Sequence, residues 1–271
     1  MSNVAFALLP RLRSSAPWAL RHLVFSMVLA ALVAFLVIGA WFPPPFVEIS
    51  GGLSLFILIA AVDVVCGPAL TLLLLHPGKT RKALWVDIVL ISVVQFSALM
   101  YGVHTLSEAR PIALVFEVDR FRVVSYADLD SSSPQTVPDW VRPWGFTPPR
   151  MLGVRSARTA EEKWESVDAS LQGIEPSQRP HWWQDYDASV PRVKERAKPL
   201  EVLLSMHPQE RQRIQAAASQ AALKPDDNET LRSEELLWLP VVSRRTMDWV
   251  AFIDPHTARI RGYVKADGFG G

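Results

Sequence analysis

The first hundred residues are dominated by three long apolar runs separated by short polar breaks. The runs cover Leu23–Phe42, Leu53–Leu75 and Ala83–Leu106. A helix needs roughly 20 apolar residues to cross a bilayer, and each run is long enough. We therefore predict a three-helix transmembrane domain over residues 23–106. It follows a polar and basic segment, residues 1–22, in which Pro10 and Pro17 oppose a long helix.

The remaining residues, 107–271, show the shorter periods of a folded soluble domain. Apolar residues alternate from Ile112 to Val118 and then change parity, which predicts a strand with a bulge or bend near Asp119. The segment Thr159-Ala-Glu-Glu162 is typical of a helix start, with Thr159 at the N-cap and Glu162 three residues later. It predicts a helix to about Leu171, with Trp164, Val167 and Leu171 on one side. Further helices are expected at 190–206 and 208–223, and strands at 151–154, 236–242, 248–254 and 258–264. The pattern predicts an α+β domain with an antiparallel sheet at its C-terminal end.

Positively charged residues are distributed unevenly around the apolar runs. They precede the first run and fill the turn His76–Lys82, whereas the loop 43–52 has no Lys or Arg. The positive-inside rule then puts the N-terminus and the 76–82 turn in the cytoplasm. Residues 107–271 would lie in the periplasm of a bacterium, and the chain in its inner membrane. A cleaved signal peptide is the alternative for the first run, but this run exceeds the usual 7–15 apolar residues and two further runs follow.

Polar residues inside the second and third runs form a predicted seam. One face of the second helix carries Asp63, Gly67 and Thr71 at positions i, i+4 and i+8. One face of the third helix carries Asp87, Ile91 and Gln95 at the same spacing. With the turn centred near Lys79 and a rise of about 1.5 Å per residue, Asp63 lies level with Gln95 and Thr71 lies level with Asp87. Gln95 can then donate a hydrogen bond to Asp63. The seam either holds this helical hairpin together, contacts a partner's transmembrane helix, or forms part of a proton or ion pathway.

Composition removes several classes of function. The formal net charge is +1 without a basic excess in 107–271, so no nucleic-acid partner is expected. The single cysteine, Cys66, excludes a disulfide and a quinone-linked thiol oxidoreductase. Catalytic and nucleotide-binding motifs are missing, and the histidines beyond residue 107 are isolated, so we expect no cofactor and no metal.

An aromatic cluster in a proline-bounded loop is the other candidate site. Trp182, Trp183 and Tyr186 either pack in the core of the domain or form a binding surface, since exposed aromatic residues anchor interfaces.

Three segments carry a resemblance to a known family. They are Asp63-Val-Val-Cys-Gly-Pro68 in the second run, His76-Pro-Gly-Lys79 in the turn, and Glu108-Ala-Arg-Pro111 continuing through Phe116-Glu-Val-Asp-Arg-Phe121. These segments resemble the type IV pilin accessory proteins of the TfpX/TfpZ family. The resemblance implies a non-enzymatic inner-membrane protein that supports assembly or display of a type IV pilin. Its partners would be membrane lipid and the pilin or pilus machinery, and Asp63, Gly67 and Asp87 could contact the pilin laterally.

Two other functions compete with this one. A sensor with a periplasmic ligand-binding domain would need an output domain, and the predicted cytoplasmic parts are only residues 1–22 and 76–82. An intramembrane enzyme would use Asp63 and Asp87, but their predicted depths differ by roughly 12 Å, too far for the two carboxylates to share a proton.

Overall fold

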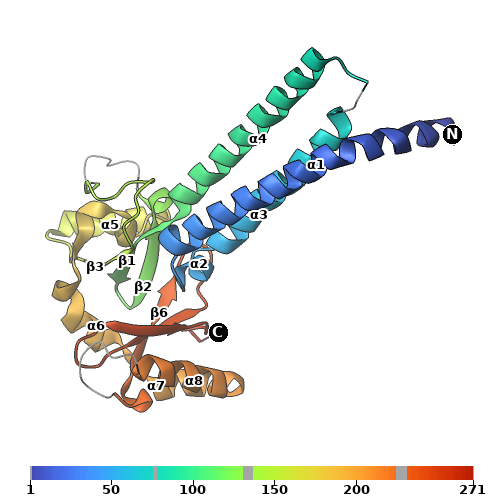
Figure 1. The fold of residues 1–271 in the computed structure, drawn as a ribbon. Coiled ribbons are helices and arrows are strands. Elements are labelled where there is room, and N and C mark those ends of the chain that lie inside the picture. Colours follow the sequence, from blue (N-terminus) through green and yellow to red (C-terminus); the bar gives the residue numbers. More distant parts are fainter. Residues whose placement is uncertain (1, 76–77, 131–136, 224–230, 271) are drawn as a thin grey trace.

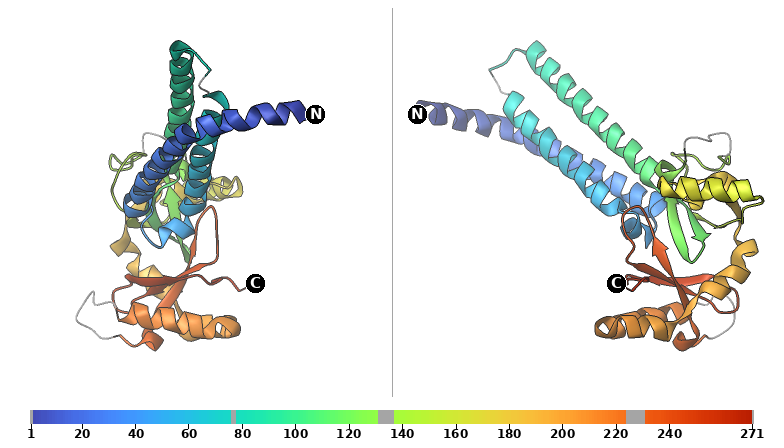
Figure 2. Two further views of the ribbon diagram at one scale, coloured as in Figure 1. Left: turned by 45° about the vertical axis from the view of Figure 1, so that its right-hand side comes forward. Right: turned by 180° about the vertical axis from the view of Figure 1, so that it is seen from behind.

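A computed structural model describes residues 2–75, 78–130, 137–223 and 231–270, with side chains from residue 15 onward. Long helices form an arm that projects from a C-terminal domain, here residues 107–271 (Figure 1). The N-terminus lies at the far end of the arm (Figure 2). Part of the turn predicted at 76–82 falls outside the described residues.

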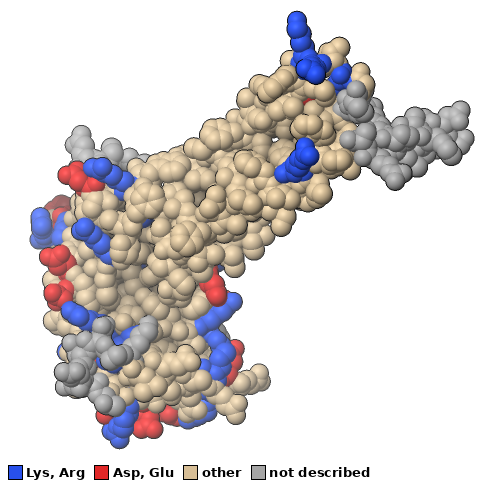
Figure 3. Space-filling model, viewed as in Figure 1, with Lys and Arg blue, Asp and Glu red and all other residues tan. Residues whose placement is uncertain are grey.

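The arm contains the three candidate membrane spans. Helix α1 (Ser2–Leu36) continues into a π-helical turn (Val37–Trp41), and short α2 (Phe46–Ile49) leads into α3 (Gly52–Leu74) and α4 (Arg81–Ala109). Three stretches are long and apolar enough to cross a membrane, namely Ser15–Trp41, Gly52–Leu74 and Arg81–Ala109. Figure 3 shows the corresponding surface almost free of charged side chains, which gather on the C-terminal domain and at the α3–α4 turn.

The start of the first helix differs from the prediction. Helix α1 runs through both Pro10 and Pro17 instead of beginning near Leu23. Helices in bilayers tolerate proline because neighbouring helices and local adjustments satisfy the freed backbone groups. Here α1 packs along α3, and the Ser15 hydroxyl donates to the Leu75 carbonyl.

The C-terminal domain is α+β, as predicted. Its mixed eight-stranded sheet has the order β4-β3-β1-β2-β6-β7-β8, with β5 paired to β6. The last three strands are antiparallel, as expected, whereas β1–β3 and β2–β6 are parallel. These parallel pairs arise because β3 and β6 return to the sheet only after long excursions. The strands are β1 (Pro111–Glu117), β2 (Arg120–Ser125), β3 (Arg150–Val154), β4 (Trp183–Asp185), β5 (Lys198–Pro199), β6 (Leu237–Val242), β7 (Trp249–Ile253) and β8 (Ile260–Val264).

Helices pack on both faces of the sheet. The helices of the C-terminal domain are α5 (Ala160–Leu171), α6 (Val190–Arg196), α7 (Leu200–Met206) and α8 (Arg211–Ala222). One face packs on α7 and α8 around buried Trp238 and Phe252. The opposite face surrounds Phe116 and Phe121 and takes in Ile49 from α2. The arm and the domain thus share a core, and the Ser243 hydroxyl donates to the Ile49 carbonyl at 2.6 Å.

Two local predictions were wrong. The parity change near Asp119 marks a hairpin turn between β1 and β2, not a bulge in one strand, and Val118 takes a positive φ of 55° there. The single helix expected at 190–206 is two helices. Proline disfavours helical geometry in the residue before it, so Lys198–Pro199 is extended and pairs with β6.

Candidate functional site

The Asp63–Gln95 pair lies at the centre of the α3–α4 contact. The side-chain amide of Gln95 donates to the Asp63 carboxylate at 2.5 Å and to the Asp63 carbonyl at 2.6 Å. Asp63 is buried, although it lies in a helix whose other faces are largely exposed. The hydrogen bond expected from the helix registers is therefore present. It gives the carboxylate an internal partner in a setting where an unpaired charge is costly.

Gly67 lets the two helices approach at this point. A Cβ atom added to it would lie 2.6 Å from the Gln95 Oε1 atom and 2.9 Å from its Cδ atom. Any larger residue would displace the amide from Asp63. The first part of the predicted face, from Asp63 to Gly67, is thus a close helix–helix contact of the small-residue type.

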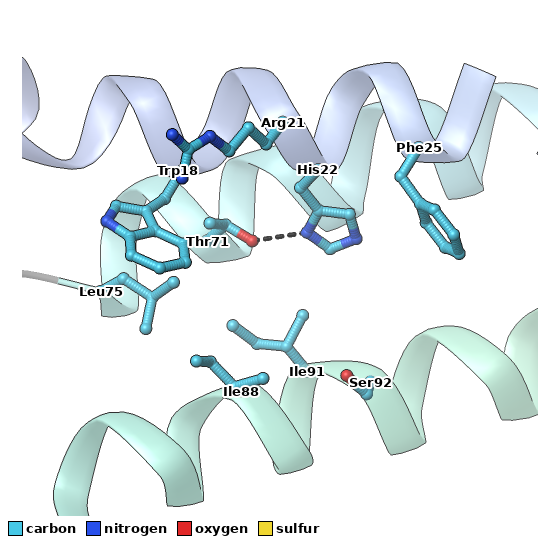
Figure 4. Close-up of a pocket in the computed structure, with 9 residues that line it drawn as sticks. All are labelled: Trp18, Arg21, His22, Phe25, Thr71, Leu75, Ile88, Ile91 and Ser92. Carbon is cyan, nitrogen blue, oxygen red and sulfur yellow. Dashed lines mark hydrogen bonds between the residues drawn. The ribbon is translucent and has the colours of Figure 1, made fainter. Parts of the chain in front are cut away.

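Thr71 and Asp87, expected to face each other, do not. The Thr71 hydroxyl donates to the Gly67 carbonyl at 3.0 Å and lies 2.6 Å from His22 Nδ1 on α1 (Figure 4). Asp87 pairs with Lys79 at 2.5 Å. Helix α4 diverges from the other two toward the turn (Figure 1), so its first turns do not reach Thr71. Asp63 and Asp87 therefore have separate partners, which removes the geometry for a shared proton.

The aromatic cluster is built into the domain. Trp182 and Tyr186 are buried, and the Tyr186 hydroxyl donates to the Ala258 carbonyl at 2.6 Å. Trp183 is half-buried, stacks on Trp140 with ring centroids 5.9 Å apart, and donates through Nε1 to the Ser177 carbonyl at 2.7 Å. This placement favours the core-packing alternative for the three side chains.

Trp182 also supports helix α5. The guanidinium groups of Arg155 and Arg179 lie 4.5 and 5.0 Å from its ring. Arg155 holds the Glu162 carboxylate with two hydrogen bonds of 2.8 and 2.9 Å, and Arg179 donates to the Ser166 hydroxyl at 2.7 Å. The polar side of α5 therefore faces the domain. The Arg155 hydrogen bond lowers the pKa of Glu162 to about 2.

The apolar side of α5 points away from the protein. Trp164, Val167 and Leu171 are 73%, 46% and 83% exposed, and we call this row the α5 stripe. The spacing i, i+3, i+7 puts the three on one side of the helix, as the sequence predicted. An amphipathic helix of a soluble domain normally buries its apolar side. The orientation of α5 is therefore inverted, with the α5 stripe facing outward. The sequence pattern alone gave no sign of the inversion.

The α4–β1 joint fixes the arm to the sheet. Arg110 follows the last residue of α4 and is buried. Its guanidinium donates to the carbonyls of Arg142, Pro143 and Thr147 at 2.6, 2.9 and 3.2 Å. Burial lowers the pKa of Arg110. The arginine thus joins the helix end, the strand and the loop before β3.

Comparison with known proteins gives a family. Residues 10–51 match the model of the family described as "Fimbrial assembly protein FimB". The fimbrial assembly protein of serogroup I from Dichelobacter nodosus is 36% identical over 92% of this chain and 93% of its own length. The serogroup E1 protein of the same organism is 35% identical over the same shares. No solved structure matches. Since these relatives are similar over almost their whole length, this chain belongs to the family of fimbrial assembly proteins.

Proposed function

We propose that this protein is a non-enzymatic accessory factor of type IV pilus assembly in a bacterial inner membrane, of the kind that the TfpX/TfpZ resemblance implies. It acts by contact with the pilin or the pilus machinery. The N-terminus and the α3–α4 turn lie in the cytoplasm, and the C-terminal domain lies in the periplasm. The relatives named as fimbrial assembly proteins and the three candidate spans support this proposal.

The α5 stripe is the observation that supports a contact with a partner protein. Large exposed apolar surfaces that are rimmed by polar residues mark interaction sites. The hydrogen bonds from Arg155 and Arg179 fix α5 by its polar side, so the helix cannot turn to bury the stripe without breaking them. By contrast, the Asp63–Gln95 pair satisfies itself internally, so we assign the seam to the stability of the hairpin.

The proposed occupant of the α5 stripe is the pilin. Exposed Glu161, Glu165 and Asp168 border the stripe, and Lys163 is the one cation within α5. An apolar ridge on the pilin with Lys or Arg beside it would complement both the shape and the charge of this surface. Amphipathic helices that bind membrane surfaces carry the opposite charge on their polar side, so the acidic border disfavours a bilayer as occupant.

The experiment replaces the chromosomal gene with a Trp164→Glu/Leu171→Glu variant and counts surface pili. We expect most pili to be lost while the abundance of the protein in the membrane stays normal. Leu223→Glu is the matched control, since Leu223 is 75% exposed but lies beyond the end of α8. Normal piliation in the double variant, or an equal loss in the control, would contradict the proposal.

A further inference from the structure

A cavity opens between the three long helices near the α3–α4 turn. Its volume is about 320 Å³. Helices α1 and α4 form two walls, with α3 behind them (Figure 4). Its lining residues are mostly apolar and come from all three helices: Trp18, Arg21, His22, Phe25, Thr71, Leu75, Ile88, Ile91 and Ser92.

Arg21 is the cation of this cavity. His22 and Thr71 satisfy each other, with the Thr71 hydroxyl also bonded to Gly67. The Arg21 guanidinium lies 5.5 Å from the Trp18 ring centre and pairs with no carboxylate among the described residues. Asp87, in the second turn of α4, is already paired with Lys79. The cavity therefore combines apolar walls with a positive charge that an anion would complement.

The lining indicates what fits. A helix is about 10 Å across and is wide for a space bounded by three packed helices, whereas part of a flexible acyl chain suits its apolar walls. Tryptophan and arginine at the end of a membrane span lie at headgroup depth, where phosphates are found. Basic pockets between transmembrane helices bind anionic headgroups for the same reasons.

We propose that this cavity binds one anionic phospholipid, with an acyl chain between α1 and α4 and the phosphate against Arg21. The lipid completes the contact between two helices that diverge at this end of the arm (Figure 2). This inference does not depend on the pilin contact, because the lipid site and the α5 stripe lie on different parts of the molecule.

The test is native mass spectrometry of the purified full chain titrated with phosphatidylglycerol in detergent. We expect one lipid to be retained. Arg21→Gln should weaken its retention about fivefold, since a basic residue near an anionic lipid contributes about 1 kcal/mol. Ile88→Trp should abolish it by filling the cavity. Arg81→Gln and Val89→Trp are the matched controls on α4, and circular dichroism confirms that each variant is folded.

Three results would overturn the proposal. The first is a loss of lipid retention in Arg81→Gln equal to that in Arg21→Gln, which would indicate diffuse attraction by the basic end of the arm. The second is retention in folded Ile88→Trp, which would place the lipid elsewhere. The third is displacement of the lipid by glycerol phosphate at similar concentration, which would identify a free-phosphate site. No pilin is present in the measurement, so its outcome is separate from that of the piliation experiment.

Discussion

Single side chains decide how the polar groups of the arm are satisfied. Asp63 is tolerable in an apolar helix because the Gln95 amide reaches both its carboxylate and its carbonyl. Gly67 makes this reach possible by leaving room for the amide. The pairing was predictable from the sequence since it needs only helix rise and a short turn. The Thr71–His22 contact was not, because it depends on how α1 packs along α3.

Replacing Gln95 with Ala should destabilise the helical hairpin. The variant loses both hydrogen bonds and leaves a buried carboxylate unpartnered, so the free energy of unfolding in detergent should fall by about 1–2 kcal/mol. Titration with a denaturing detergent, followed by circular dichroism, measures this change. Ser97→Ala, at an exposed position on the same helix, is the control. A loss no larger than that of the control would show that the pair does not hold the hairpin.

Acid should release helix α5 from the domain. Hydrogen bonding to Arg155 lowers the pKa of Glu162 from 4.5 to about 2. The contact therefore stabilises the folded state above pH 4.5, and this contribution is lost as the pH falls toward 2. Carboxyl chemical shifts followed by NMR should give a midpoint near the lower value. In Arg155→Gln the midpoint should return toward 4.5, and an unchanged midpoint would refute the assigned cause.

Elements with strong periodicity were predicted well, and elements set by distant contacts were not. The spans, the helix starting at Thr159 and the strands near the C-terminus follow from local patterns. The mixed sheet does not, because parallel pairing depends on where β3 and β6 return. The outward orientation of the apolar side of α5 was equally unpredictable from local patterns. It results from Arg155 and Arg179, which contact α5 from outside the helix.

The α4–β1 joint should depend on Arg110. Its guanidinium satisfies three carbonyls, and hydrogen bonds to charged groups contribute about 1.5–3 kcal/mol each. Arg110→Ala should therefore lower the free energy of unfolding by at least about 3 kcal/mol, seen as a reduced melting temperature by circular dichroism. Arg244→Ala, at an exposed arginine, is the control. Equal melting temperatures for the two variants would contradict a structural role for the joint.

At the scale of the whole molecule, the arm and the C-terminal domain form one structure. Ile49 lies in the domain core, and Phe46 contacts Tyr263 with ring centroids 6.0 Å apart. A bilayer around the arm would therefore hold the domain, and with it the α5 stripe, at a defined orientation. Under the proposed pilin contact, this coupling would present the α5 stripe to a pilin in the same membrane.

The proposed orientation can be tested by cysteine labelling. In a Cys66→Ala background, Glu234→Cys should react with a membrane-impermeant maleimide in intact spheroplasts. Lys82→Cys should react only after lysis, because it lies at the α3–α4 turn. The opposite labelling pattern would show that the chain crosses the membrane in the reverse orientation, with the α5 stripe in the cytoplasm.

The central claim is that the α5 stripe contacts the pilin, and site-specific photocrosslinking in living cells tests it most directly. A photoreactive amino acid at position 164 should form a covalent adduct with the pilin, identified by its mass and by antibody. The same probe at position 223, equally exposed but distant in the chain, should form none. Adducts with lipid or with a second copy of this chain at position 164, and none with the pilin, would contradict the account.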